Sequence, residues 1–178
     1  MKFLVVAYPE IPDADFKLIQ DFRRQHDALN YKLVLPHFTL VFAVEEIAET
    51  IFLDEVKKQL AGFSGFQFTA GHASLHKDDF KNYFHAFLVP GDGYRVLVQL
   101  HDKLYSEQLS IHLRKDIPYI PHIGIGNSTE QAACEKMVEE WNARELRIRG
   151  TVKTIDVIRF DGQKIYPLEK IALSEFAS

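Results

Sequence analysis

The sequence predicts an α+β protein made of two pseudo-symmetric lobes, each an antiparallel sheet with flanking helices, that face each other across a central cleft. The 178 residues are 47% hydrophobic and 26% charged, which is typical of a globular domain with a sizeable core. Fourteen phenylalanines and seven tyrosines favour a β-rich interior. A Pro-His step followed by an alternating apolar stretch occurs twice, at Pro36-His37 and Pro121-His122, and this repeat predicts the two similar halves.

The first half of the chain alternates strand and helix signals. Pro9 ends the first apolar run, Pro12 and Asp13 are helix start signals, and Gly62 stands where a second helix would end. A charged turn then separates two apolar runs, which predicts a hairpin. The predicted elements are strand 2–8, helix 13–29, strand 33–44 with the first Pro-His step, helix 47–60, strand 63–75 and strand 83–89.

The second half repeats this order. An apolar stripe at helical spacing follows the break at 90–93, and Ser128 with Gln131 has the spacing of a capping box. Asp161-Gly162 between alternating stretches is a strong hairpin signal. The predicted elements are helix 94–108, strand 119–126 with the second Pro-His step, helix 128–144, strand 146–161 and strand 164–173.

Helix, histidine strand, helix and hairpin therefore occur twice, over 13–89 and over 94–173. We interpret this as an internal duplication within a single bilobal domain spanning 1–178, with the lobes connected near 90–93.

Composition limits the classes of partner. A net charge of −4 argues against an extended nucleic-acid-binding face but is compatible with a small nucleotide or an RNA terminus. The single cysteine, Cys134, excludes an intramolecular disulfide and a thiolate cluster for zinc, and we expect it to pack as a small apolar residue. The N-terminal apolar run is too short to span a membrane and lacks signal-peptide spacing. We expect a cytoplasmic monomer that contacts no membrane.

The two Pro-His steps place histidine side chains, which can transfer protons, on predicted strands. Because positions i and i+2 share a face, His37 would lie beside Thr39, with Phe38 and Leu40 in the core, and His122 would lie beside Gly124. Imidazole titrates near neutrality, so two such histidines brought face to face can serve as the acid and base of phosphoester cleavage without a metal.

On these motifs the chain resembles the 2H phosphoesterase superfamily, which includes 2′-5′ RNA ligase-like proteins and cyclic nucleotide phosphodiesterases. His37-Phe38-Thr39-Leu40 matches the family pattern of His, hydrophobic, Thr or Ser, hydrophobic. His122-Ile123-Gly124-Ile125 matches except at its third position, where Gly124 replaces the hydroxyl residue. The resemblance implies a phosphoesterase with no metal and no cofactor that acts on a 2′,3′-cyclic phosphate or a 2′-5′ linkage. Its catalytic residues would be His37 as acid, His122 as base and Thr39 as phosphate ligand.

Further residues are candidates for contacts with the substrate. Lys32 and Arg114 precede the two histidine strands in matching places, and Tyr119 stands near a strand end where it could stack on a base. Gly124 could offer its backbone N–H or make room for the substrate. Each also has an ordinary structural interpretation, as a solvated surface charge or a core aromatic residue.

Two alternatives stay open at this point. The loss of the hydroxyl at Gly124 is compatible with a catalytically impaired module that binds a nucleotide or RNA end. A cluster of His72, His76 and His85 could bind zinc, although no carboxylate or cysteine completes an obvious site. We expect His26, His101 and His112 to be solvated.

Overall fold

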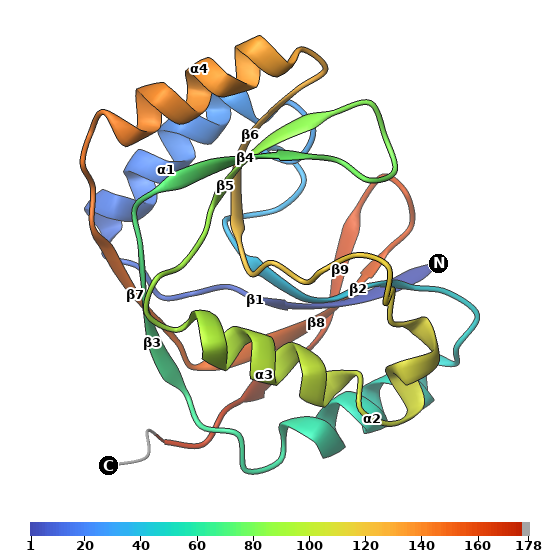
Figure 1. Ribbon diagram of the computed structural model, residues 1–178. Coiled ribbons are helices and arrows are strands. Elements are labelled where there is room, and N and C mark those ends of the chain that lie inside the picture. The colour runs from blue at the N-terminus through green and yellow to red at the C-terminus, as the bar shows by residue number, and fades with distance from the viewer. Residues whose placement is uncertain (176–178) are drawn as a thin grey trace.

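The computed structural model describes residues 1–175 of the chain. Its helices and strands follow the alternating order that the sequence predicts (Figure 1). The strands are β1 (Lys2–Ala7), β2 (Phe38–Val44), β3 (Phe66–Ala70), β4 (Ala73–Lys77), β5 (Phe84–Leu88), β6 (Ile123–Ser128), β7 (Ile148–Val152), β8 (Thr154–Phe160) and β9 (Ile165–Ala172). The helices are α1 (Asp13–His26), α2 (Glu49–Leu60), α3 (Tyr94–Leu104), the short 3₁₀ helix η1 (Gln108–His112) and α4 (Gln131–Asn142).

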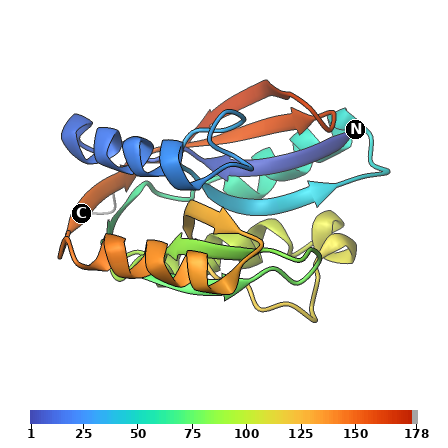
Figure 2. The same ribbon diagram turned by 90° about the horizontal axis from the view of Figure 1, so that it is seen from above.

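The strands form antiparallel sheets, which confirms the predicted α+β class. One sheet has the order β2-β1-β8-β9, a second has the order β4-β5-β6, and β3 pairs with β7 alone. Viewed from above, the four-stranded and three-stranded sheets lie in two layers, with α1 beside the upper layer and α4 beside the lower one (Figure 2). Each histidine motif leads into a strand of a different sheet, β2 in one and β6 in the other.

Two predicted long strands are each divided between sheets. The stretch 63–75 forms β3 and β4, and 146–161 forms β7 and β8, so the prediction of single strands there is wrong. The first break lies at Gly71, where a Cβ would come within 2.0 Å of the Leu146 carbonyl oxygen. The Trp141 indole N–H donates to the Gly71 carbonyl at 2.7 Å and holds the break in place. The first parts, β3 and β7, then pair with each other.

Helices cover one side of each large sheet. Phe52 of α2 stacks on Phe3 of β1 with ring centroids 5.4 Å apart, and α3 packs on β2. On the other sheet, α4 packs on all three strands and α1 packs on β6. Phe22 of α1 meets Trp141 of α4 edge to face at 5.1 Å. The buried apolar residues of both layers belong to one continuous cluster, which includes Cys134 as expected.

Several predicted helices are longer than the helices in the structure. The first helix ends at His26 and not at 29, because Asp27 leaves the helical conformation (φ −109°, ψ 70°) and its side chain accepts from the Asn30 backbone N–H. The third helix ends at Leu104 and is followed by η1. The predicted capping box is also wrong: α4 begins at Gln131, and Ser128, still on β6, accepts a hydrogen bond from the Glu130 N–H.

The histidines stand one residue before their strands. Strands β2 and β6 begin at Phe38 and Ile123, because the prolines at 36 and 121 have no N–H to donate to a ladder. The predicted alternation is confirmed on the buried side, where Phe38, Leu40, Ile123 and Ile125 are at most 1% exposed. Gly162, at φ +103°, makes the predicted hairpin between β8 and β9. Among residues 1–175, no helix has the length and apolar character needed to cross a membrane.

Candidate active site

Each motif histidine is held by the backbone of its own segment. The Nδ1 of His37 lies 2.7 Å from the Leu35 carbonyl oxygen, and the Nδ1 of His122 lies 2.7 Å from the Ile120 carbonyl oxygen. A carbonyl only accepts hydrogen bonds, so each Nδ1 carries the proton. Both rings are thereby fixed in the tautomer that leaves Nε2 with its lone pair, which is the form a general base needs. The same device occurs in both halves of the chain.

Burial favours the neutral form of both imidazoles. Loss of solvent lowers the pKa of His122 from 6.5 to about 4, although its bond to Ile120 opposes the shift. The positive charge that His37 would carry lowers the pKa of His122 further, so the two rings lie within electrostatic reach of one another. Burial also lowers the pKa of His37. The hydrogen bond to the Leu35 carbonyl opposes this shift, the positive charge of Arg23 adds to it, and the negative charge of Asp27 opposes it.

Tyr119 joins the segment of the second motif to the strand of the first. Its hydroxyl donates to the Thr39 carbonyl oxygen at 2.9 Å, and burial raises the pKa of this phenol, which keeps it a donor. Its ring stacks on His101 at 3.7 Å, and the Nδ1 of His101 bonds the Leu40 carbonyl oxygen at 2.8 Å. His101 is only 3% exposed, so the expectation that it is solvated is wrong.

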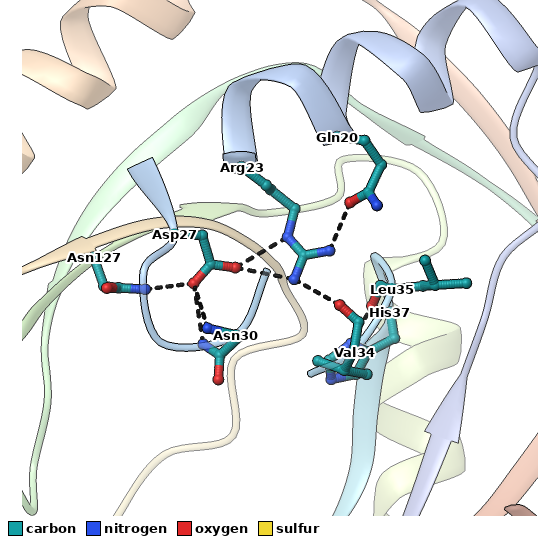
Figure 3. Close-up of polar contacts among 8 residues, drawn as sticks. All are labelled: Gln20, Arg23, Asp27, Asn30, Val34, Leu35, His37 and Asn127. Carbon is teal, nitrogen blue, oxygen red and sulfur yellow. Dashed lines mark hydrogen bonds and ion pairs between the residues drawn. The ribbon is translucent and has the colours of Figure 1, made fainter. Parts of the chain in front are cut away.

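A buried ion pair makes a second connection. Arg23 and Asp27, one helical turn apart at the end of α1, have side chains 2% exposed and approach to 3.0 Å. The Arg23 guanidinium also donates to the Gln20 side-chain oxygen and to the Val34 carbonyl oxygen, both at 2.8 Å (Figure 3). Val34 immediately precedes Leu35, whose carbonyl holds His37, so Arg23 fixes the segment that orients this histidine.

Asp27 extends the network to the other sheet. Its Oδ1 accepts from the Asn127 amide of β6 at 2.5 Å and from the Asn30 backbone N–H at 3.1 Å (Figure 3). Asn127 lies five residues after His122, near the far end of β6. The Asn127 amide oxygen is buried and has no partner among residues 1–175, and the reverse orientation would set it against the Asp27 carboxylate. Asn127 is therefore committed to this network and is not free to replace the missing motif hydroxyl.

Strand register sets the neighbours of each motif. Thr39 lies opposite Val6 of β1, which in turn lies opposite Asp156 of β8. On the other sheet, Gly124 lies opposite Phe87 of β5. The Phe87 ring stacks on His122 with centroids 3.5 Å apart and an interplanar angle of 12°. A Cβ on Gly124 would meet no atom within 4 Å, so the surface above this glycine is open.

Comparison with known families identifies the chain. Residues 9–164 match the family model described as the 2′-5′ RNA ligase superfamily. This chain belongs to that superfamily. The resemblance to 2H phosphoesterases that the two motifs predict is confirmed, and family and fold together point to a phosphoesterase or RNA ligase-like enzyme. No curated protein sequence matches the chain.

Several solved structures share the whole fold at low sequence identity. The protein TT0787 of Thermus thermophilus is 12% identical, with a TM-score of 0.62 over 98% of this chain and 99% of that one. E. coli LigT complexed with 3′-AMP is 17% identical, with a TM-score of 0.60 over 97% and 98% of the two chains. Kluyveromyces marxianus Usb1 is 7% identical, with a TM-score of 0.62 over 97% and 98%. LigT structures are also described with ATP and NADP+.

Two predicted substrate ligands are exposed on the surface. Lys32 is exposed. Arg114 is exposed and makes a two-pronged ion pair with Asp116, at 2.9 and 2.6 Å, while its guanidinium lies over the Phe80 ring. Contact of either residue with a substrate remains a prediction. Tyr119 joins the two motif segments, and its hydroxyl and one ring face are taken by Thr39 and His101, so stacking of a base on its ring stays a prediction.

A separate hollow of about 690 Å³ lies along β3 and β7. It is lined by residues such as Gln67, Thr69, Arg147 and Arg149, and none of the predicted site residues reaches it. Among residues 1–175, no three histidine, cysteine or carboxylate side chains gather as metal ligands, so the zinc hypothesis has no ligand set.

The sequence interpretation missed Arg23, Asp27 and the structural role of His101. The signal for the ion pair was the i,i+4 spacing of opposite charges on the stripe of Ile19 and Phe22, where a solvated residue is not expected. His101 likewise falls on the buried stripe of α3, one turn before Tyr105.

Replacing Asp27 with Asn should destabilise the protein by about 3–5 kcal/mol, because it leaves the buried Arg23 charge without its counter-ion. Urea unfolding followed by circular dichroism measures this difference. Asp21→Asn is the matched control, since Asp21 makes an exposed ion pair with Lys17 on the same helix, and its unfolding midpoint should hardly change. Equal midpoints for the two variants would contradict the role given to the buried pair.

Proposed function

We propose that this protein is a metal-independent phosphoesterase that hydrolyses, or reversibly ligates, a 2′,3′-cyclic phosphate or 2′-5′ phosphodiester of RNA or a nucleotide. The observation that carries this proposal is the pair of imidazoles, one from each half, each with Nδ1 bonded to the carbonyl two residues earlier. Both rings then present Nε2 for proton transfer to a substrate between them. Membership of the superfamily supports the reaction class.

In hydrolysis, His122 acts as the base and His37 as the acid. The Nε2 of His122 removes a proton from water, whose oxygen forms a new bond to phosphorus. The bond between phosphorus and the 2′ or 3′ oxygen breaks, and the Nε2 proton of His37 goes to that leaving oxygen. The product is a phosphomonoester beside a free hydroxyl. The depressed pKa of His122 keeps it in the unprotonated form that can accept a proton, which supports this assignment.

Thr39 binds the phosphate group itself. It lies two residues after His37 on β2, on the side opposite the buried Phe38 and Leu40, where its hydroxyl can donate to a non-bridging oxygen as negative charge builds. An anion held there also raises the pKa of His37, so the acid is protonated in the complex more readily than in the free protein.

Gly124 favours a second candidate function. The position equivalent to Thr39 has no hydroxyl, and the loss of one such donor typically costs about 10²–10³ in rate. The same fold with an impaired site would bind a nucleotide or an RNA end without turnover.

Replacing His37 or His122 with Ala should lower kcat on a 2′,3′-cyclic nucleotide by about 10²–10⁴, because each removes one proton-transfer step. Product is measured by chromatography, with EDTA present throughout, and the wild-type rate should be insensitive to the chelator. His112→Ala, in the short helix η1, is the control and should keep the wild-type rate. Full activity in both motif variants would end the catalytic assignment.

Gly124→Thr separates the two candidate functions. Nothing lies within 4 Å of the added Cβ, so the variant should fold normally and restore the second hydroxyl. If the protein is a weakened enzyme, kcat should rise by up to about 10²-fold. No turnover in either protein, with nucleotide binding retained in calorimetry, would instead support the binding module.

The pH dependence of kcat/KM should be a bell centred on the acid side of neutrality. Activity should be lost below about pH 4, where His122 becomes protonated, and should decline as pH rises through the pKa of His37, which lies below 6.5. Initial rates between about pH 3.5 and 9 measure this profile. A plateau extending over the alkaline half of that range would show that His37 is not the acid.

A further inference from the structure

Two more histidines lie on the same sheet face as His122. His76 of β4 lies directly opposite His85 of β5, and Phe87 is two residues further along β5, on the same face. The Phe87 ring stacks with all three imidazoles: its centroid is 3.5 Å from that of His122, 4.9 Å from His76 and 5.4 Å from His85. One aromatic ring therefore separates His76 and His85 from His122.

Each additional imidazole has one nitrogen engaged and one free. The Nε2 of His76 lies 2.8 Å from the Ser74 hydroxyl, and the Nε2 of His85 lies 3.0 Å from Oδ2 of Asp78. Neither Nδ1 takes part in a hydrogen bond among residues 1–175. The rings are thus oriented by fixed partners at Nε2 while Nδ1 stays open to a ligand, whereas in the motif pair the open nitrogen is Nε2.

Asp78 holds the His85 ring in place without competing for the ligand. Its other oxygen accepts the backbone N–H groups of Phe80 and Lys81 at 2.7 and 2.8 Å. Burial alone would raise the pKa of Asp78, but the bonds from His85 and these two N–H groups outweigh it and lower the pKa. The ionised Asp78 carboxylate accepts from Nε2 of His85 at 3.0 Å and fixes the orientation of the ring.

The surroundings suit an anion. His76 and His85 are both partly exposed, and the open surface above Gly124 adjoins Phe87. Burial lowers the pKa of His76, and the neighbouring His85 lowers it further. A bound anion would relieve that mutual repulsion.

We propose that His76 and His85 form an anion subsite beside the motif histidines that binds a second phosphate group of the substrate. This inference rests on the proposed function and narrows its substrate class. The preferred substrate is a nucleotide or RNA end that bears another phosphate in addition to the cyclic one, such as a nucleoside 2′,3′-cyclic phosphate with a 5′-phosphate. Each ring donates to that second phosphate from Nδ1, and the bound anion favours the protonated imidazole that this hydrogen bond requires.

Two measurements test the subsite. Calorimetry compares the binding of adenosine 2′-monophosphate with that of adenosine 2′,5′-bisphosphate, and kinetics compares adenosine 2′,3′-cyclic phosphate with and without a 5′-phosphate. Wild type should prefer the second phosphate in each pair by about tenfold, the equivalent of one charge-assisted contact. In His85→Gln and in His76→Gln this preference should fall to about twofold or less. His72→Gln, an exposed histidine just before β4, should keep it.

The outcomes distinguish this inference from the proposed function. Equal affinity and equal kcat/KM for the two members of each pair in wild type would overturn the subsite while leaving the phosphoesterase intact. An undiminished preference in both glutamine variants would also overturn it. If wild type turns over neither cyclic phosphate, the phosphoesterase fails, and the calorimetric preference still decides whether the second phosphate is bound.

Discussion

The buried ion pair between Arg23 and Asp27 is the constraint on which the candidate site depends. Burying two charges costs several kcal/mol per ion unless the geometry satisfies both groups, and here almost every polar atom of the pair has a partner. Those partners are the Val34 carbonyl, one residue before the group that holds His37, and the Asn127 amide on β6. The pair therefore fixes the segment of the first motif and the strand of the second to the same helix end.

The two motif histidines are held in the same way but have different surroundings. Both histidines are held in one tautomer by a carbonyl two residues earlier, and this needs only the local chain path after each Pro-His step. Around His37 lie the opposing charges of Arg23 and Asp27, whereas His122 is stacked on Phe87 and faces other imidazoles. Burial is the main cause of the low pKa of His122, and the other imidazoles lower it further, which underlies the different roles proposed for the two histidines. Gly124 is a further difference between the two halves. Because it has no side chain, it leaves the sheet face that carries His76, His85 and His122 uncovered.

Local pattern was sufficient to predict much of the fold and the motif pair. Alternation correctly separated the buried Phe38 and Ile123 from their histidine neighbours, and the repeated order of elements predicted the antiparallel sheets. It could not predict the change of sheet at Gly71, which depends on the Leu146 backbone, distant in sequence. The buried ion pair could not be predicted for a similar reason. Opposite charges at i,i+4 are common on solvated helices, and only the packing of α1 against β6 shows that Arg23 is buried.

The central claim is that both motif imidazoles engage one phosphate through Nε2. Long-range ¹H–¹⁵N NMR of the histidine rings, during titration with adenosine 2′-monophosphate, tests it most directly. Free protein should show Nδ1–H in His37 and in His122, and the Nε2 signals of both should shift together with a single dissociation constant. A response from only one ring, or two different dissociation constants, would contradict a shared site.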